Sequence, residues 1–266
     1  IFAKETHIDA KSTVVIRCIL SMENALLKLK SLNPKLSITH DASQHDMYYM
    51  NQSDSVIYNS KKKARGIVKE FRSAHTHPQR LMSLLFNDSG YWQKKLDAQA
   101  LMRNIYKLAM NVQSSEIRHT MNLTGLFTED ERYDLWAQNA YWYLYYGPSR
   151  YTDGVQPYSQ RNLLHKIISQ ADSCLRLDNC GAHLRFGHDT MVMPLTCLLE
   201  LDDTNRDIPD LNTLPQKEWC DYRIFPMACN IQLVFYRSVG AKAKTADKDS
   251  KNKDILVKIL RNENEA

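Results

Sequence analysis

The stretch Ala182-His183-Leu184-Arg185-Phe186-Gly187-His188-Asp189-Thr190-Met191-Val192-Met193-Pro194-Leu195 changes its pattern in the middle. Side chains alternate as far as Phe186, which predicts a β-strand. Gly187 permits a sharp turn, and the apolar residues after Thr190 predict a helix. Open α/β sheets bind ligands at the C-terminal ends of their strands, and helix N-termini favour anions. The junction at Gly187 is therefore a candidate site.

Helices and strands alternate on both sides of this junction. Residues 10–32 carry apolar side chains at steps of three and four, with Ser12 and Thr13 as capping-type residues, which predicts a helix. A second helix is predicted from Ser159, and strands over 36–39, 230–237 and 254–260. The Lys-, Asp- and Ala-rich segment 240–253 predicts a solvated loop. This order favours an α/β fold with helices layered against a sheet.

The residues from Lys61 to about Tyr146 differ from the rest of the chain. Their pattern is helical, glycine is nearly absent, and no convincing strand occurs. We therefore predict a layered α/β core formed by residues 1–58 and 150–266, with a large all-helical cap insertion over residues 59–149.

Composition excludes several classes of protein. Of the 266 residues, 43% are hydrophobic and 24% charged, which is typical of a globular protein with a sizeable core. The net charge of +5 favours an anionic ligand, but Lys and Arg are scattered, so no nucleic-acid partner is predicted. No run of 18 apolar residues occurs, and no membrane span is predicted.

The cysteines and histidines do not predict a metal site. There is no Cys-x-x-Cys, and His75-Thr76-His77 lacks an evident third ligand, so neither a metal nor another cofactor is expected. Two pairs are close enough in sequence for disulfides in an oxidising compartment, although all six cysteines could equally be buried thiols. These pairs are Cys174/Cys180 and Cys220/Cys229.

Three residues have chemistry suited to a phosphate. His188 can donate to a phosphate oxygen, and Asp189, if protonated, can give a proton to a leaving alkoxide. Arg17, early in the first helix, can hold two phosphate oxygens in a bidentate fork. The alternatives are that Asp189 or Thr190 only caps the helix, that His188 is a turn residue, and that Arg17 is a surface residue.

Two segments together carry a resemblance. Ser12-Thr13 followed by Arg17 and Ser21, and Leu184 to Thr190, resemble two segments of the histidine acid phosphatases of branch 2 of the histidine phosphatase superfamily. The match is to the branch of multiple inositol polyphosphate phosphatases and phytase-like enzymes. Further stretches are similar to that branch: Leu135-Trp136, Trp142-Tyr143, Asn162-Leu163-Leu164, Ala171-Asp172 and Leu256 to Glu263.

The resemblance implies two-step phosphoryl transfer through a phosphohistidine. Asp189 would protonate the departing oxygen and then help water hydrolyse the intermediate, while Arg17 and His188 neutralise the phosphate oxygens. Many relatives have His-Ala-Glu where this chain has His188-Asp189-Thr190, so the donor is Asp by position, as in phytase-like members. The family's Arg-His-Gly-x-Arg-x-Pro signature does not occur in the 266 residues. The resemblance therefore places the nucleophilic His, and the strand bearing it, upstream of the chain.

The resemblance also implies a substrate class and a compartment. We expect a phosphomonoesterase that acts on phytate or related inositol phosphates in the periplasm or outside the cell. A catalytically silent phosphate-binding module and a general acid phosphatase for small monoesters stay open as alternatives, and so does the oligomeric state. Basic residues of the cap could bind the other phosphates, unless they only form a solvated helix face: Lys61, Lys62, Lys63 and Arg65, with Arg72 and Arg80 as further candidates.

Overall fold

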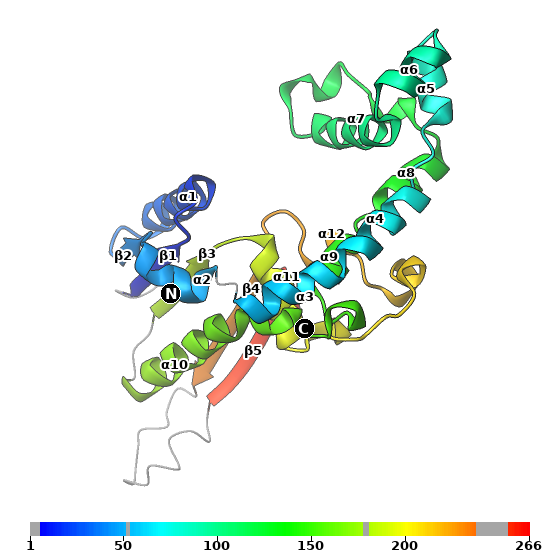
Figure 1. Ribbon diagram of the computed structural model, residues 1–266. Coiled ribbons are helices and arrows are strands. Elements are labelled where there is room, and N and C mark those ends of the chain that lie inside the picture. Colours follow the sequence, from blue (N-terminus) through cyan, green and yellow to red (C-terminus); the bar gives the residue numbers. More distant parts are fainter. Residues whose placement is uncertain (1–5, 52–53, 178–180, 238–254) are drawn as a thin grey trace.

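The first described strand belongs to a parallel sheet in this computed structural model, which describes residues 6–51, 54–177, 181–237 and 255–266 (Figure 1). The strands of this sheet are β1 (His7–Ser12), β2 (Ser37–Asp41) and β3 (Gly181–Phe186), in the order β2-β1-β3. Ser12 of β1 pairs with Phe186 of β3. The backbone N–H of Thr13 donates to the Phe186 carbonyl at 3.0 Å. The C-terminal ends of β1 and β3 thus lie side by side.

Helix α1 (Ile16–Leu32) packs its buried residues onto this sheet. Met22 and Leu26 meet Ile8 and Ala10 of β1 in one apolar cluster. The prediction of a helix from residue 10 was wrong for its first six residues. Strand β1 extends to Ser12, and the N-cap residue of α1 is Val15. Ile8 and Ala10 are buried and alternate with more exposed neighbours, which is the strand period of two.

A second sheet is antiparallel and contains β4 (Ile231–Arg237), β5 (Ile255–Arg261) and β6 (Asn264–Glu265) in that order. The predicted strands at 230–237 and 254–260 are confirmed to within a residue. The described strands form two sheets where the sequence suggested one. The segment 240–253 lies outside the described residues.

Two helices flank strand β3 in the sequence and pack against each other. Helix α10 (Arg161–Leu177) precedes β3, and α11 (Asp189–Leu198) follows it, as the strand-turn-helix pattern predicted. They bury Leu163, Met191 and Leu195 together with Tyr49 and Met50 of the short helix α2 (Met47–Met50).

Residues 61–146 form helices joined by short turns and contain no β-strand, as predicted. Helices α5 to α7 lie far from both sheets, and α4 and α8 lead to them (Figure 1). Their tip has a hydrophobic cluster of its own, built from residues between Leu81 and Leu135. The core and cap boundaries stay a prediction. The helices are α3 (Ser55–Lys63), α4 (Arg65–Ala74), α5 (Gln79–Leu85), α6 (Ser89–Lys95), α7 (Ala98–Val112), α8 (Glu129–Ala137) and α9 (Ala140–Tyr146).

Short helical turns complete the described chain. Helix α12 (Asp221–Ile224) precedes β4. In the residues described, no helix is both long and apolar enough to cross a bilayer. The 3₁₀ turns are η1 (Gln44–Asp46), η2 (Glu116–His119), η3 (Thr124–Leu126), η4 (Arg150–Thr152), η5 (Gln156–Gln160), η6 (Leu201–Asp203), η7 (Leu211–Thr213) and η8 (Pro215–Lys217). The interleaved helices and parallel strands confirm the α/β fold class.

Candidate functional site

The structure brings Arg17 and His188 into contact at the C-terminal ends of β1 and β3. The Arg17 Nη2 atom lies 3.1 Å from His188 Nδ1. On the other side of the ring, His188 Nε2 lies 3.2 Å from the hydroxyl of Thr13, a buried residue that directly follows β1. Thr13 was expected to cap a helix. It instead holds the imidazole.

These contacts assign the protons of His188. A guanidinium has only donors, so Nδ1 must accept from Arg17 and Nε2–H must donate to Thr13. Burial of the ring lowers the pKa of His188, and the charge of Arg17 lowers it further. The imidazole is therefore neutral at pH 7, and Arg17 supplies the positive charge of the pair.

Cys18 fixes the turn between β3 and α11. Its buried thiol donates to the Gly187 carbonyl at 3.1 Å and lies 3.7 Å from His188 Nδ1. Gly187 has no left-handed φ, so the turn does not depend on that property of glycine. A Cβ at Gly187 would instead lie 2.9 Å from the Met191 sulfur. Sequence reasoning did not identify Cys18, because its contact depends on the approach of α1 to the turn.

Asp189 is the first residue of α11, with His188 as the N-cap residue. Its side chain is exposed, and its Oδ1 accepts from the Thr190 backbone N–H at 2.8 Å. A carboxylate in the first turn of a helix is favoured by the helix dipole. One oxygen of Asp189 thus accepts a hydrogen bond at the start of the helix, which leaves Oδ2 for another partner.

The negative charge of Asp189 acts on two tyrosines of α9, Tyr141 and Tyr146. Burial raises the pKa of Tyr141 to about 12, and the negative charge of Asp189 contributes to that rise. Burial and the charge of Asp189 also raise the pKa of Tyr146. The aromatic run Tyr141 to Tyr146 lies in the segment that the sequence predicts to be helical. Its proximity to Asp189 was not predicted.

Two of the basic residues proposed for the cap lie against these tyrosines. The Lys61 ammonium sits 3.8 Å from the Tyr146 ring centroid, and the Arg72 guanidinium 4.9 Å from that of Tyr141. Burial lowers the pKa of Lys61 to about 8. Lys61 and Arg72 thus lie over the two α9 tyrosines on which the charge of Asp189 acts.

The other proposed basic residues make different contacts. Lys62 lies 4.5 Å above the Tyr58 ring, and Lys63 forms an ion pair of 2.6 Å with Asp153. Arg80 forms an ion pair with Glu131, its Nε lying 2.8 Å from the carboxylate. Arg65 is exposed. The structure does not bring these four residues together with His188.

The predicted Cys220/Cys229 disulfide is absent from the described residues. Cys220 and Cys229 are free thiols. Cys174 is also free, and Cys180 lies outside the described residues.

A protein-family model matches most of the chain. The model of the histidine phosphatase superfamily (branch 2) matches residues 23–262, a range that includes His188 and Asp189 but not Arg17. A search of curated proteins gave no match.

Solved structures of a Bifidobacterium longum multiple inositol polyphosphate phosphatase are similar in fold. The phosphate complex is 17% identical, with a TM-score of 0.63 over 99% of this chain and 69% of the other. The inositol hexasulfate complex is 16% identical, with a TM-score of 0.67 over 99% and 68%. Because the family model spans far more than half of the sequence, the chain belongs to branch 2 of the histidine phosphatase superfamily.

Proposed function

We propose that the protein is a phosphomonoesterase that hydrolyses inositol polyphosphates such as phytate, with Arg17 and His188 holding the scissile phosphate. The observation that carries the proposal is the contact of Arg17 with His188 at the strand ends, beside the N-terminus of α11. Family membership supports a phosphatase activity. The neighbouring complexes with phosphate and inositol hexasulfate support an inositol phosphate as the substrate.

Asp189 would act as the proton donor to the leaving oxygen. Its exposed carboxyl group follows His188 directly and its charge acts on the His188 imidazole, which supports a position beside the bound phosphate. The nucleophile would be a histidine from a segment upstream of the chain, and the intermediate a phosphohistidine. Phosphoryl transfer of this kind depends on positioning and on neutralising oxygen charge, which are the tasks of Arg17 and His188. We also propose export to the periplasm or the extracellular space.

The test is phosphate release from phytate by the full-length protein, at low salt. We expect release that is lost in Arg17→Ala and retained in Arg118→Ala, a matched change of an exposed arginine in η2. An acid-labile phosphoprotein should accumulate when the reaction is quenched early. Binding of inorganic phosphate without turnover would instead favour a silent phosphate-binding module. Turnover of phytate no faster than that of p-nitrophenyl phosphate would favour a general acid phosphatase.

A further inference from the structure

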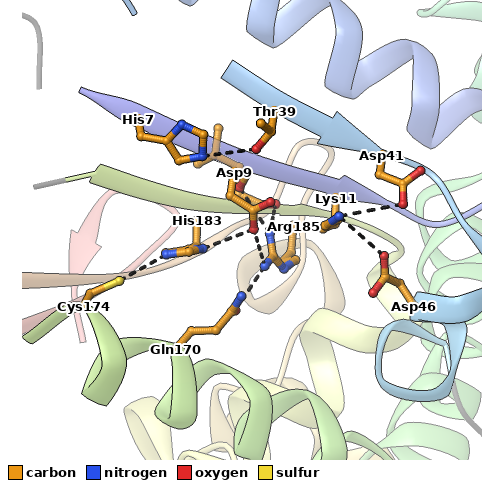
Figure 2. A network of polar contacts seen from close by, with 11 residues as sticks. His7, Asp9, Lys11, Thr39, Asp41, Asp46, Gln170, Cys174, His183 and Arg185 are labelled. Carbon is orange, nitrogen blue, oxygen red and sulfur yellow. Dashed lines mark hydrogen bonds and ion pairs between the residues drawn. The ribbon is translucent and has the colours of Figure 1, made fainter. Parts of the chain in front are cut away.

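A second group of polar side chains lies on the parallel sheet, outside the site around His188 (Figure 2). Cys174 of α10, His183 of β3 and Asp9 of β1 form a chain of contacts. The Cys174 sulfur is 3.2 Å from His183 Nε2, and His183 Nδ1 is 3.2 Å from Asp9 Oδ2. A nucleophile, a base and a group that orients the base thus follow one another, supplied by three separate elements.

The contacts determine the roles of the two imidazole nitrogens. Asp9 can only accept when ionised, so Nδ1 of His183 carries the hydrogen and Nε2 is free to accept from the thiol of Cys174. Burial alone would raise the pKa of Asp9. However, the hydrogen bond and charge of Arg185, together with the hydrogen bond of His183, bring that pKa below its ordinary value. Asp9 is therefore ionised at neutral pH.

The surrounding residues hold this arrangement in place. Arg185 Nη2 lies 2.8 Å from the Asp9 carboxylate and 3.0 Å from Gln170 Oε1 on α10 (Figure 2). Gln170 precedes Cys174 by one helical turn, so Arg185 links α10 to β1 beside the thiol. Cys174 is half-buried and free, and the His183 side chain is 38% exposed, so a small reagent can reach both.

We propose that Cys174 is a modification site whose thiol, activated by His183 and oriented through Asp9, exchanges with small-molecule disulfides of the glutathione class. The thiol proton passes to His183 Nε2, and the thiolate attacks one sulfur of the disulfide. The reagent's S–S bond breaks as the Cys174–sulfur bond forms. Cys174 is thereby oxidised, and the departing thiolate, the reduced half, takes the proton from Nε2.

The other described cysteines are less suited to thiol–disulfide exchange. Cys18, Cys197 and Cys220 are buried. Cys229 is half-buried, but burial raises the pKa of its thiol to about 11. Reactivity requires thiolate character and access together. Cys174 combines access with a hydrogen-bonded base.

The proposal is tested by limited alkylation of the full-length protein with iodoacetamide, followed by peptide mapping. Trypsin cleaves after Arg176, so Cys174 and Cys180 fall on different peptides. We expect Cys174 to react roughly 10-fold or more faster than Cys229, because Cys174 is accessible and hydrogen-bonded to a base, whereas burial raises the pKa of the Cys229 thiol. Because this comparison uses the unmodified protein, it does not depend on a variant folding. Glutathione disulfide should then form a mixed disulfide on the same peptide.

His183→Gln tests the role of the base. It should slow alkylation of Cys174 and move its pH profile to higher pH, because the imidazole is lost while the side-chain size is similar. The groups facing His183 are Asp9 of β1, Arg185 of β3 and Cys174 of α10. His165→Gln, the same change at an exposed histidine of α10, is the matched control and should leave the rate near that of the unmodified protein. The proposal is overturned if Cys174 reacts no faster than Cys229, if it is already in a disulfide before reagent is added, or if His183→Gln has an unchanged profile.

Discussion

The guanidinium of Arg17 donates to Nδ1 of His188 at 3.1 Å, across 171 positions of sequence. In this arrangement the only cation of the pair is Arg17, and the imidazole has no free proton on Nδ1. A phosphate that binds between the two must take Arg17 as its own donor and leave Nδ1 without a partner. Protonation of Nδ1 then gives the phosphate a second cationic donor.

The first prediction is that phosphate binding raises the pKa of His188. In the free protein this pKa lies below 6.5 because of burial and of Arg17. Bound phosphate favours the charged imidazole, so binding takes up a proton. The affinity for phosphate should fall as the pH rises from the His188 pKa of the free protein to that of the phosphate-bound protein. NMR titration of the His188 ring with and without inorganic phosphate measures both values.

Arg17→Ala serves as the control for this titration. Without the guanidinium, the pKa of His188 in the free protein should rise toward its ordinary value, and the shift on adding phosphate should shrink. If phosphate left the His188 pKa unchanged in the unmodified protein, the imidazole would not be a phosphate ligand.

The second prediction concerns Asp189→Asn in the full-length protein. The amide oxygen of the variant can still accept from the Thr190 N–H, so the start of α11 should be preserved. Loss of the donated proton should reduce kcat for alkyl phosphates by roughly 10² or more. Aryl phosphates, whose leaving groups need less protonation, should lose less. Equal losses on the two substrates would mean that Asp189 is structural.

The third prediction is a stability effect in the core. Tyr143 is fully buried, and its hydroxyl accepts from the Ile208 N–H at 2.6 Å. Tyr143→Phe leaves that buried donor without its partner, which should lower the free energy of unfolding by about 1–3 kcal/mol. Urea denaturation measures the loss. Tyr158→Phe, a change at a 57% exposed tyrosine, should stay within about 0.5 kcal/mol of the unmodified protein.

The part of the site at residues 181–190 could be predicted because its pattern is local. Alternation up to Phe186, Gly187 and the apolar helix after it together specify a strand, a turn and a helix. Strand β1 was missed because it is short, and its buried residues Ile8 and Ala10 run into a helical pattern. Its parallel pairing with β3 joins residues about 174 positions apart, and no local pattern records that pairing.

The basic residues of the cap show a different limit. Consecutive residues of a helix point about 100° apart, so Lys61, Lys62 and Lys63 could not all face one site. That much follows from the sequence. Which of the three lies against the aromatic residues of α9 depends on how α3 packs against α9, and this contact is set by tertiary structure. The structure selects Lys61, through Tyr146.

The last prediction therefore concerns Lys61 and rests on the proposed substrate. With a pKa of about 8, Lys61 is a cation below pH 8 and neutral above it. Phytate binds the cationic form, so bound phytate should raise the pKa of Lys61. The KM of phytate should then rise as the pH increases above 8, in total by roughly tenfold for each unit by which binding raises that pKa. Lys61→Arg should remove this rise, because arginine stays charged. Lys63→Ala should leave the profile unchanged, since Lys63 already pairs with Asp153. The KM of p-nitrophenyl phosphate should depend little on any of these changes. Identical KM profiles for phytate in Lys61→Arg and in the unmodified protein would exclude Lys61 from the binding surface.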